Sequence, residues 1–267
     1  RIYLNNEWVR KSMSEAMLKK FEETVASWSD EMVYSHLGSW IRISEDGSKW
    51  GNPIRVPVTA PHGPIKLSNG NLLYFGKAAV ADRNFHSELQ NGMIRASVSK
   101  DGGLTWEVIG EVPIPEDTEA ANFHEPHAVE LKSGKIIGMI RYQHSQKIKN
   151  YDRFTMFQTE SFDGGKTWSI ARPTGVSGSP PHLLRHSSGA IICVYGYREI
   201  PYGQRAMISY DEGQTWDTDY ILRDDGPDSD LGYPASVELD DGSIFTIYYQ
   251  KYAAGEKTSL LWTRWEL

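Results

Sequence analysis

Cysteine is almost absent from the chain. Cys193 is the single one in 267 residues, so no disulfide can form within the chain. That count neither favours nor excludes secretion. Long apolar runs are missing as well, because no segment approaches the roughly 20 apolar residues that a membrane-spanning helix needs. We therefore expect no membrane span.

Basic charge is also scarce. The sequence holds 28 Lys and Arg against 35 Asp and Glu, a formal net charge of −7. Since no basic stripe stands out, nucleic acid is not an expected partner. The chain opens with Arg1 in RIYLNNEWVR, neither a methionine nor a signal peptide. We expect a processed or truncated piece, and the sequence leaves secreted, periplasmic and cytoplasmic locations open.

Aromatic residues, in contrast, are abundant, at 12% of the chain with nine tryptophans. Four of these tryptophans end copies of one short motif, and three copies share the pattern S-x-D-x-G-x-T-W. The copies are SEDGSKW (44–50), SKDGGLTW (99–106), SFDGGKTW (161–168) and SYDEGQTW (209–216). We predict a hairpin turn in which Asp accepts backbone N–H bonds, Gly adopts a positive φ, and Trp packs beneath.

A second repeat alternates with the first. It reads as strand, glycine turn and apolar strand, with turn glycines at Gly70, Gly134, Gly189 and Gly242, spaced 64, 55 and 53 residues apart. One period is therefore two hairpins, or four strands, in about 50–60 residues, which is typical of β-propeller blades. The inner strands are apolar almost throughout, as expected where neighbouring blades cover both faces.

The first motif resembles the Asp-box, or BNR, motif of the sialidase superfamily, whose domains are typically six-bladed propellers. The resemblance covers roughly residues 30–267. It implies an all-β fold, a six-bladed β-propeller of sialidase type. The chain is one to two blades short of a closed ring, so we expect either that sequence upstream is absent or that the ring closes in an unusual way.

The first 30 residues differ from the repeats. Apolar side chains share one helical face at Met13, Met17, Phe21, Val25 and Trp28. Ser12 and Glu15 form a predicted capping box. We expect one amphipathic helix, an insertion that packs on the propeller, and we divide the chain into an N-terminal segment (1–30) and the propeller blades (31–267).

Residues beside the inner strands of a propeller line its axial pocket. Nine residues before the turn glycines stand Pro61, Glu125, Pro180 and Tyr233, and seven before them stand Gly63, His127, His182 and Ala235. Positions two apart share a strand face. Glu125 and Tyr233 are therefore predicted to occupy equivalent places in different blades, both directed at the axis. The alternative for each is a solvated residue at the rim.

Histidines and arginines gather in the same segments. The histidines are His62, His124, His127 and His182. They could form a hydrogen-bond network, contact a substrate or bind a metal, but no tight H-x-x-x-H or carboxylate–His spacing supports a metal. Arg141 ends one inner hairpin, Arg205 in YGQRAMIS begins the third predicted strand of the fourth unit, and Arg198 lies near it. Each arginine could pair structurally with a carboxylate, while two flanking one pocket would form a fork for a substrate carboxylate.

The segments HEPHAVEL…MIR, QRAMIS and GYPASVEL resemble the active site of sialidases in order and character. The resemblance implies that Tyr233 is the nucleophile, Glu125 its base, and Arg141 and Arg205 the ligands of the substrate carboxylate. A neutral tyrosine avoids the repulsion that a carboxylate nucleophile would meet on sialic acid. The implied activity is an exo-acting, retaining glycoside hydrolase of a terminal acidic sugar, with no cofactor.

Two departures from the sialidase pattern leave other functions open. The first arginine of the family, in an F/Y-R-I-P segment, has no convincing match. The general acid has no exact match either. His36 is the nearest position by register, Asp30 lies a little upstream, and either could serve as the acid. The surplus of histidines favours a lyase or unusual glycosidase acting on uronic-acid glycans. The missing arginine favours a carbohydrate-binding propeller without catalysis.

Overall fold

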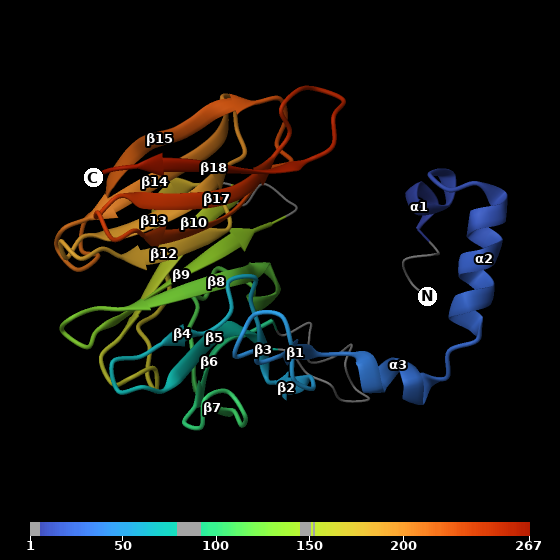
Figure 1. Ribbon diagram of the computed structural model, residues 1–267, viewed down its shortest axis with the longest axis horizontal. Coiled ribbons are helices and arrows are strands. Elements are labelled where there is room, and N and C mark those ends of the chain that lie inside the picture. Colours follow the sequence, from blue (N-terminus) through green and yellow to red (C-terminus); the bar gives the residue numbers. More distant parts are fainter. Residues whose placement is uncertain (1–5, 79–91, 145–150, 152) are drawn as a thin grey trace.

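A computed structural model describes residues 6–78, 92–144, 151 and 153–267 of the chain. These residues form mostly β-structure, as antiparallel sheets that follow one another in chain order (Figure 1). The described part of the chain contains no helix that combines the length and the apolar character needed to cross a membrane.

Four of the sheets are propeller blades, and a two-stranded sheet precedes them. The two-stranded sheet pairs β1 (Ser39–Ile41) with β2 (Ile54–Val56). The first blade contains β3 (Val58–Thr59), β4 (Ile65–Lys66), β5 (Leu72–Ala78), β6 (Ile94–Ser99) and β7 (Glu107–Glu111). A 3₁₀ turn, η3 (Ala120–Asn122), leads to the second blade, with β8 (Phe123–Glu130), β9 (Ile136–Gln143), β10 (Phe154–Ser161) and β11 (Arg172–Ser177).

The last two blades complete the described β-structure. The third contains β12 (Pro181–Arg185), β13 (Ile191–Tyr197), β14 (Tyr202–Ser209) and β15 (Asp217–Gly226). The fourth contains β16 (Gly232–Glu238), β17 (Ile244–Gln250) and β18 (Ser259–Trp265). The predicted β-propeller is therefore confirmed. A six-bladed ring goes beyond the four blades of the described residues and stays a prediction.

Glycine turns join the two innermost strands of each blade, as the second repeat predicted. Gly70, Gly134, Gly189 and Gly242 all have φ between +82° and +96°. In that left-handed region a residue with a Cβ is disfavoured by roughly 1–2 kcal/mol. The glycines thus fix the end of each inner hairpin, and with it the register of the residues counted from the turn.

The Asp-boxes form the predicted turns, although Trp50 of the first copy is 58% exposed and does not pack beneath its turn. In the copy at 161–168, Asp163 accepts hydrogen bonds from the Thr167 hydroxyl (2.6 Å) and backbone N–H (2.9 Å), and from the Ser161 hydroxyl (2.9 Å). The bonds from Thr167 first of all hold the pKa of Asp163 at about 2. Trp168 is buried and stacks on Phe75 of the preceding blade, with ring centroids 4.6 Å apart. The box therefore also joins adjacent blades.

The N-terminal segment differs from the prediction. It contains three helices, α1 (Glu7–Lys11), α2 (Glu15–Ala26) and α3 (Asp30–His36). Ser14, not Ser12, caps α2 by accepting the N–H of Met17, while Ser12 ends α1. No residue of α2 is buried, and α1 and α2 stand apart from the sheets in Figure 1. An amphipathic pattern marks a face that can be buried but does not say what covers it. The expected packing on the propeller is not observed, and the boundary at residue 30 stays a prediction.

Candidate active site

Two polar side chains meet at the carboxylate of a third, and the three come from three different strands. The Tyr233 hydroxyl of β16 donates to Oε1 of Glu125 on β8, at 2.5 Å. Arg141 of β9 donates from Nη1 to Oε2 of the same carboxylate, also at 2.5 Å, and from Nη2 to Gln143. Tyr233 and Glu125 are 108 positions apart in the sequence. The fold therefore places a phenol at one oxygen of the Glu125 carboxylate and a guanidinium at the other.

The same backbone device positions Glu125 and Tyr233. Both have a positive φ, 43° and 50°, which residues with a Cβ rarely adopt. The strand pairing shifts register at both places, between His124 and His127 and between Gly232 and Ala235. Such a bulge redirects a side chain out of the regular alternation. Equivalent positions in two blades thus carry the two contacting groups.

Burial and charge both act on Tyr233. Burial raises the pKa of the Tyr233 hydroxyl above 10, and so do the hydrogen bond to Glu125 and the negative charge of that carboxylate. Arg141 opposes the rise. At neutral pH the hydroxyl is therefore protonated, and the short bond to Glu125 gives its proton an acceptor already in contact.

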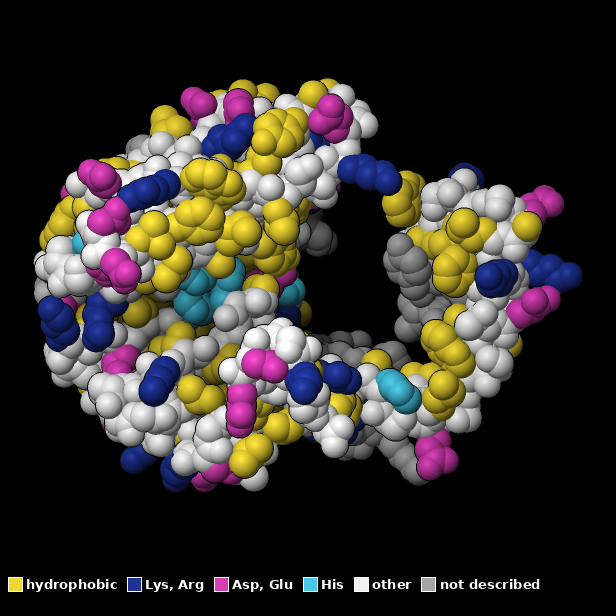
Figure 2. Space-filling model, in the orientation of Figure 1, with side chains coloured by type: hydrophobic (Ala, Val, Ile, Leu, Met, Phe, Trp, Pro, Cys, Tyr) yellow, Lys and Arg dark blue, Asp and Glu magenta, His cyan; other side chains and the backbone are white. Residues whose placement is uncertain are grey.

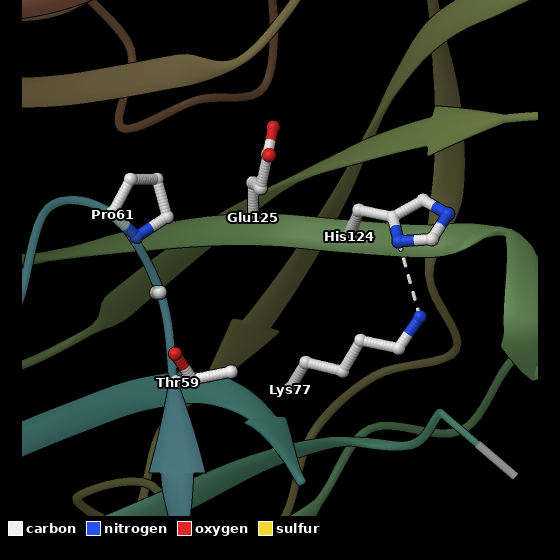
Figure 3. Close-up of a pocket in the computed structure, with 6 residues that line it drawn as sticks. Thr59, Pro61, Lys77, His124 and Glu125 are labelled. Carbon is white, nitrogen blue, oxygen red and sulfur yellow. Dashed lines mark hydrogen bonds between the residues drawn. The ribbon is translucent and has the colours of Figure 1, made fainter. Parts of the chain in front are cut away.

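A cavity of about 390 Å³ opens beside Glu125. Its lining residues are Thr59, Ala60, Pro61, Lys77, His124 and Glu125. Figure 3 shows Lys77 reaching from β5 to His124, which adjoins Glu125 on β8. The Lys77 ammonium donates to Nδ1 of His124 and to the carbonyl of Ala121, each at 3.1 Å.

The electrostatics of this cavity favour a neutral histidine and a charged lysine. Burial, then the charges of Lys77 and Arg141, lower the pKa of His124 to about 4. Burial lowers the pKa of Lys77 to about 8, against the attraction of Glu125. At pH 7 His124 is therefore neutral and accepts, while Lys77 is mostly protonated and donates.

The other three candidate histidines lie together near the axis: His127 and His182 stack, and His62 lies edge-on to both, and we call the three the histidine stack. The rings of His127 and His182 lie 4.5 Å apart at 16°, and the His62 ring is 5.1 and 5.0 Å from them. In Figure 2 a group of histidine side chains fills the hollow between the sheets. Nδ1 of His127 accepts the N–H of Leu183 (2.9 Å), and Nδ1 of His182 accepts that of Ser236 (3.3 Å). Each of these two bonds joins one blade to the next.

Burial keeps this stack uncharged. It lowers the pKa of His62 to about 4 and that of His182 to about 3, and it holds the pKa of His127 well below its usual range. The described residues contain no cluster of three or more His, Cys, Asp or Glu suited to a metal ion.

The two remaining arginines lie in different surroundings. Arg205 is buried and donates to the carbonyl oxygens of Arg223 (2.8 Å) and Pro201 (3.3 Å), with its guanidinium 4.8 Å from the Tyr197 ring. These bonds direct it to the backbone of the outer part of its blade. Arg198 donates to the carbonyl of Ser229 (2.8 Å) and lies beside Gly232, where a Cβ would be 3.4 Å from Nη2. Arg198 therefore borders the segment that carries Tyr233.

The two candidates for the general acid are not brought to the cavity. Asp30 and His36 lie on α3, which stands outside the sheets in Figure 1. His36 is exposed, and its Nδ1 lies 2.8 Å from the carbonyl of Met32 on its own helix. The register count had placed this segment in a blade strand, whereas the cap at Ser29 starts a helix there.

Sequence reasoning missed Lys77, although the register contains it. Lys77 follows Gly70 by seven residues, as Arg141 follows Gly134 and Tyr249 follows Gly242. Counting seven residues forward from these turn glycines, as well as back, would have predicted a polar group at the pocket end of the strand that follows each turn.

Comparisons with known proteins agree on the fold. No curated protein sequence matches the chain. A protein of unknown function from Dyadobacter fermentans is similar, with 25% identity and a TM-score of 0.71, over 86% of this chain and 64% of that one. The NanB sialidase of Streptococcus pneumoniae has 19% identity and a TM-score of 0.63, over 85% of this chain and 35% of that one. An α-L-arabinanase of Penicillium chrysogenum has 18% identity and a TM-score of 0.58, over 85% and 66%.

These neighbours include glycoside hydrolases, and the chain spans less than two thirds of the length of the first two. The sequence family described as BNR repeat-like domain matches residues 9–246. That match covers most of the chain, including the first three blades, the start of the fourth and both Glu125 and Tyr233. The chain therefore belongs to the BNR repeat-like domain family.

Proposed function

We propose that the protein is a retaining, exo-acting glycoside hydrolase that cleaves a terminal acidic sugar, with Tyr233 as nucleophile and Glu125 as its base. The observation that carries this proposal is the 2.5 Å hydrogen bond from the Tyr233 hydroxyl to Glu125. Its support is the meeting of two groups from distant blades beside a cavity, on a fold shared with glycoside hydrolases.

The chemistry follows from the protonation states. Tyr233 attacks the anomeric carbon and its phenolic proton passes to Glu125. The bond from that carbon to the leaving oxygen breaks as the oxygen takes a proton from solvent water. Water then displaces the tyrosine and restores the phenol. The two displacements together retain the anomeric configuration. A phenol suits a sugar with a carboxylate on the reacting carbon, because a second anion would be repelled there.

Arg141 positions Glu125 in this scheme. Its ion pair with Glu125 keeps that side chain oriented towards Tyr233, and its second nitrogen is held by Gln143. Both oxygens of Glu125 are therefore engaged before substrate arrives. Such preorganisation lowers the reorganisation that the reaction requires.

Replacing Tyr233 tests the proposal. Tyr233→Phe should lower the turnover of an aryl sialoside by at least 100-fold, a loss in line with removing a nucleophile, and should leave the melting temperature nearly unchanged. Tyr210→Phe is the matched control, because Tyr210 is an exposed Asp-box residue, and it should keep wild-type turnover. Equal turnover by Tyr233→Phe and wild type would remove Tyr233 from the mechanism. A product with the absorbance of a new double bond would replace the hydrolase by a lyase.

A further inference from the structure

Lys77 is the positional counterpart of Arg141 in the neighbouring blade. Each follows its turn glycine by seven residues, and each lies at or near the end of the second strand of its blade, β5 and β9. Arg141 contacts Glu125 directly, and Lys77 lines the same cavity as Glu125. Two cations from adjacent blades thus border one carboxylate.

The two cations differ in what they are bound to. Arg141 is paired with Glu125 at 2.5 Å and hydrogen-bonded to Gln143, so its charge is already matched. Lys77 donates to two neutral acceptors, the Ala121 carbonyl and His124. No carboxylate of the described residues lies within ion-pair distance of Lys77. Among the described residues, the pocket therefore contains one positive charge without a bonded anion.

The lysine is also held in place by its surroundings. A Cβ on Gly92 would lie 2.8 Å from Cε of Lys77 and 2.6 Å from the carbonyl oxygen of Ala120, so this glycine leaves the space that the lysine stem occupies. Burial accounts for most of the lowered pKa of Lys77, to about 8, because an ammonium loses hydration there. A partly dehydrated cation gains most from an anionic ligand that enters the cavity.

We propose that Lys77 binds the carboxylate of the acidic sugar and so selects acidic over neutral sugars at this site, an inference that rests on the proposed function. Lys77 takes the role of the first arginine of the sialidase pattern, the one in the F/Y-R-I-P segment that has no convincing match in this chain. His124 orients the ammonium by accepting one of its protons, and the Ala121 carbonyl accepts a second. The third proton is left for the ligand.

Calorimetric binding of free sugars tests this without any turnover. The probes are N-acetylneuraminic acid and galacturonic acid, with galactose as the neutral counterpart of the latter. Lys77→Met should weaken the binding of at least one acid by about 10-fold or more, the usual effect of losing a charge-assisted hydrogen bond, and should leave galactose unchanged. Lys66→Met is the matched control, because Lys66 is exposed and pairs with the opposite end of β5, and it should bind as wild type does.

The pH dependence separates a charge effect from a structural one. Acid binding by the wild type should weaken above about pH 8, as Lys77 loses its proton. The facing groups do not explain such a loss, since His124 is already neutral, Arg141 stays charged, and Tyr233 titrates above pH 10. Lys77→Arg should retain acid binding to higher pH.

Three results would overturn the inference. They are wild-type affinity for both acids no greater than for galactose, acid binding unaffected by Lys77→Met, or the same pH profile in Lys77→Arg. None of them requires activity, so the role of Tyr233 in turnover is decided separately. Acid binding that does not depend on Lys77, with turnover of the sialoside still dependent on Tyr233, would overturn this inference and leave the proposed function standing.

Discussion

The backbone is strained at Glu125 and Tyr233. Outside glycine, positive φ in the described residues occurs at these two and at Glu212. A left-handed conformation costs an L-residue roughly 1–2 kcal/mol. Strain of this kind persists where the surrounding structure enforces it, and it concentrates at functional sites. Here it turns both side chains towards each other from different blades.

The strain predicts that glycine is more stabilising than alanine at position 125, the reverse of the usual order within a strand. Glu125→Gly should be more stable than Glu125→Ala by about 0.5–1 kcal/mol, because glycine adopts the positive φ freely. Glu130, on the same strand with ordinary φ, is the matched site, and there Gly should be less stable than Ala by a similar amount. Urea unfolding of the four variants measures this. Lower stability of Gly at both positions would mean that residue 125 is not strained.

At the residue scale, the sequence predicted the strand positions of site residues better than it predicted where their terminal polar groups lie. Counting from the turn glycines placed Glu125 and Tyr233 in equivalent places, because a fixed turn sets the register of a hairpin. It could not tell that the long side chain of Arg205 bends to backbone carbonyls. Spacing gives the face of a strand, whereas packing decides where a flexible guanidinium goes.

At the scale of elements, the glycines inside the strands matter as much as those in the turns. Gly138 lies in the middle of β9, and a Cβ there would be 2.7 Å from the Phe75 ring of the preceding blade. Phe75 in turn stacks on Trp168 of the Asp-box. Packing of the Phe75 ring against β9 therefore depends on the absence of a side chain at Gly138, and the same ring stacks on the tryptophan of the box.

Gly138→Ala should consequently destabilise the fold by about 1–3 kcal/mol, the usual cost of overpacking a core. Gly51→Ala is the matched control: its φ is not positive, and the nearest atom to its Cβ would be the Ile43 carbonyl at 3.4 Å. That variant should unfold at nearly the wild-type urea concentration. Equal effects of the two substitutions would show that the blades adjust to the extra methyl group.

The blades were predictable as elements because each repeats a strong local pattern, whereas the N-terminal helices were not. Asp, Gly and Trp at fixed offsets specify a turn wherever they occur. The helical segment offers three serines as caps, and only contacts decide among them: Ser14 starts α2 and Ser29 starts α3. Periodicity predicted one helix with an apolar face from Met13 to Trp28, which overlaps α2, whereas α1 and α3 were not expected.

At the scale of the whole molecule, the histidine stack links blades around the axis. His62, His127 and His182 come from three consecutive blades, and two of them accept backbone N–H groups of the next blade. Acceptance requires a ring nitrogen without a proton. Protonation would remove these bonds and place like charges about 5 Å apart.

This arrangement predicts that the fold loses stability in mild acid. The unfolded histidines take up protons near pH 6.5, while the folded ones, with pKa values of about 4 for His62 and about 3 for His182, do not. Because the unfolded state then binds more protons, the free energy of unfolding should fall as the pH drops from about 7 to 4. His62 alone corresponds to roughly 3 kcal/mol across that window.

Urea unfolding at pH 7 and pH 4.5 measures the loss. His182→Gln keeps a side-chain acceptor but removes one titrating ring, so its stability should fall less between the two pH values than that of the wild type. His36→Gln is the control, because His36 is exposed on α3, and it should lose as much as the wild type does. An equal loss in His182→Gln would mean that the acid sensitivity arises outside the stack, and that the stacked rings join the blades by packing alone.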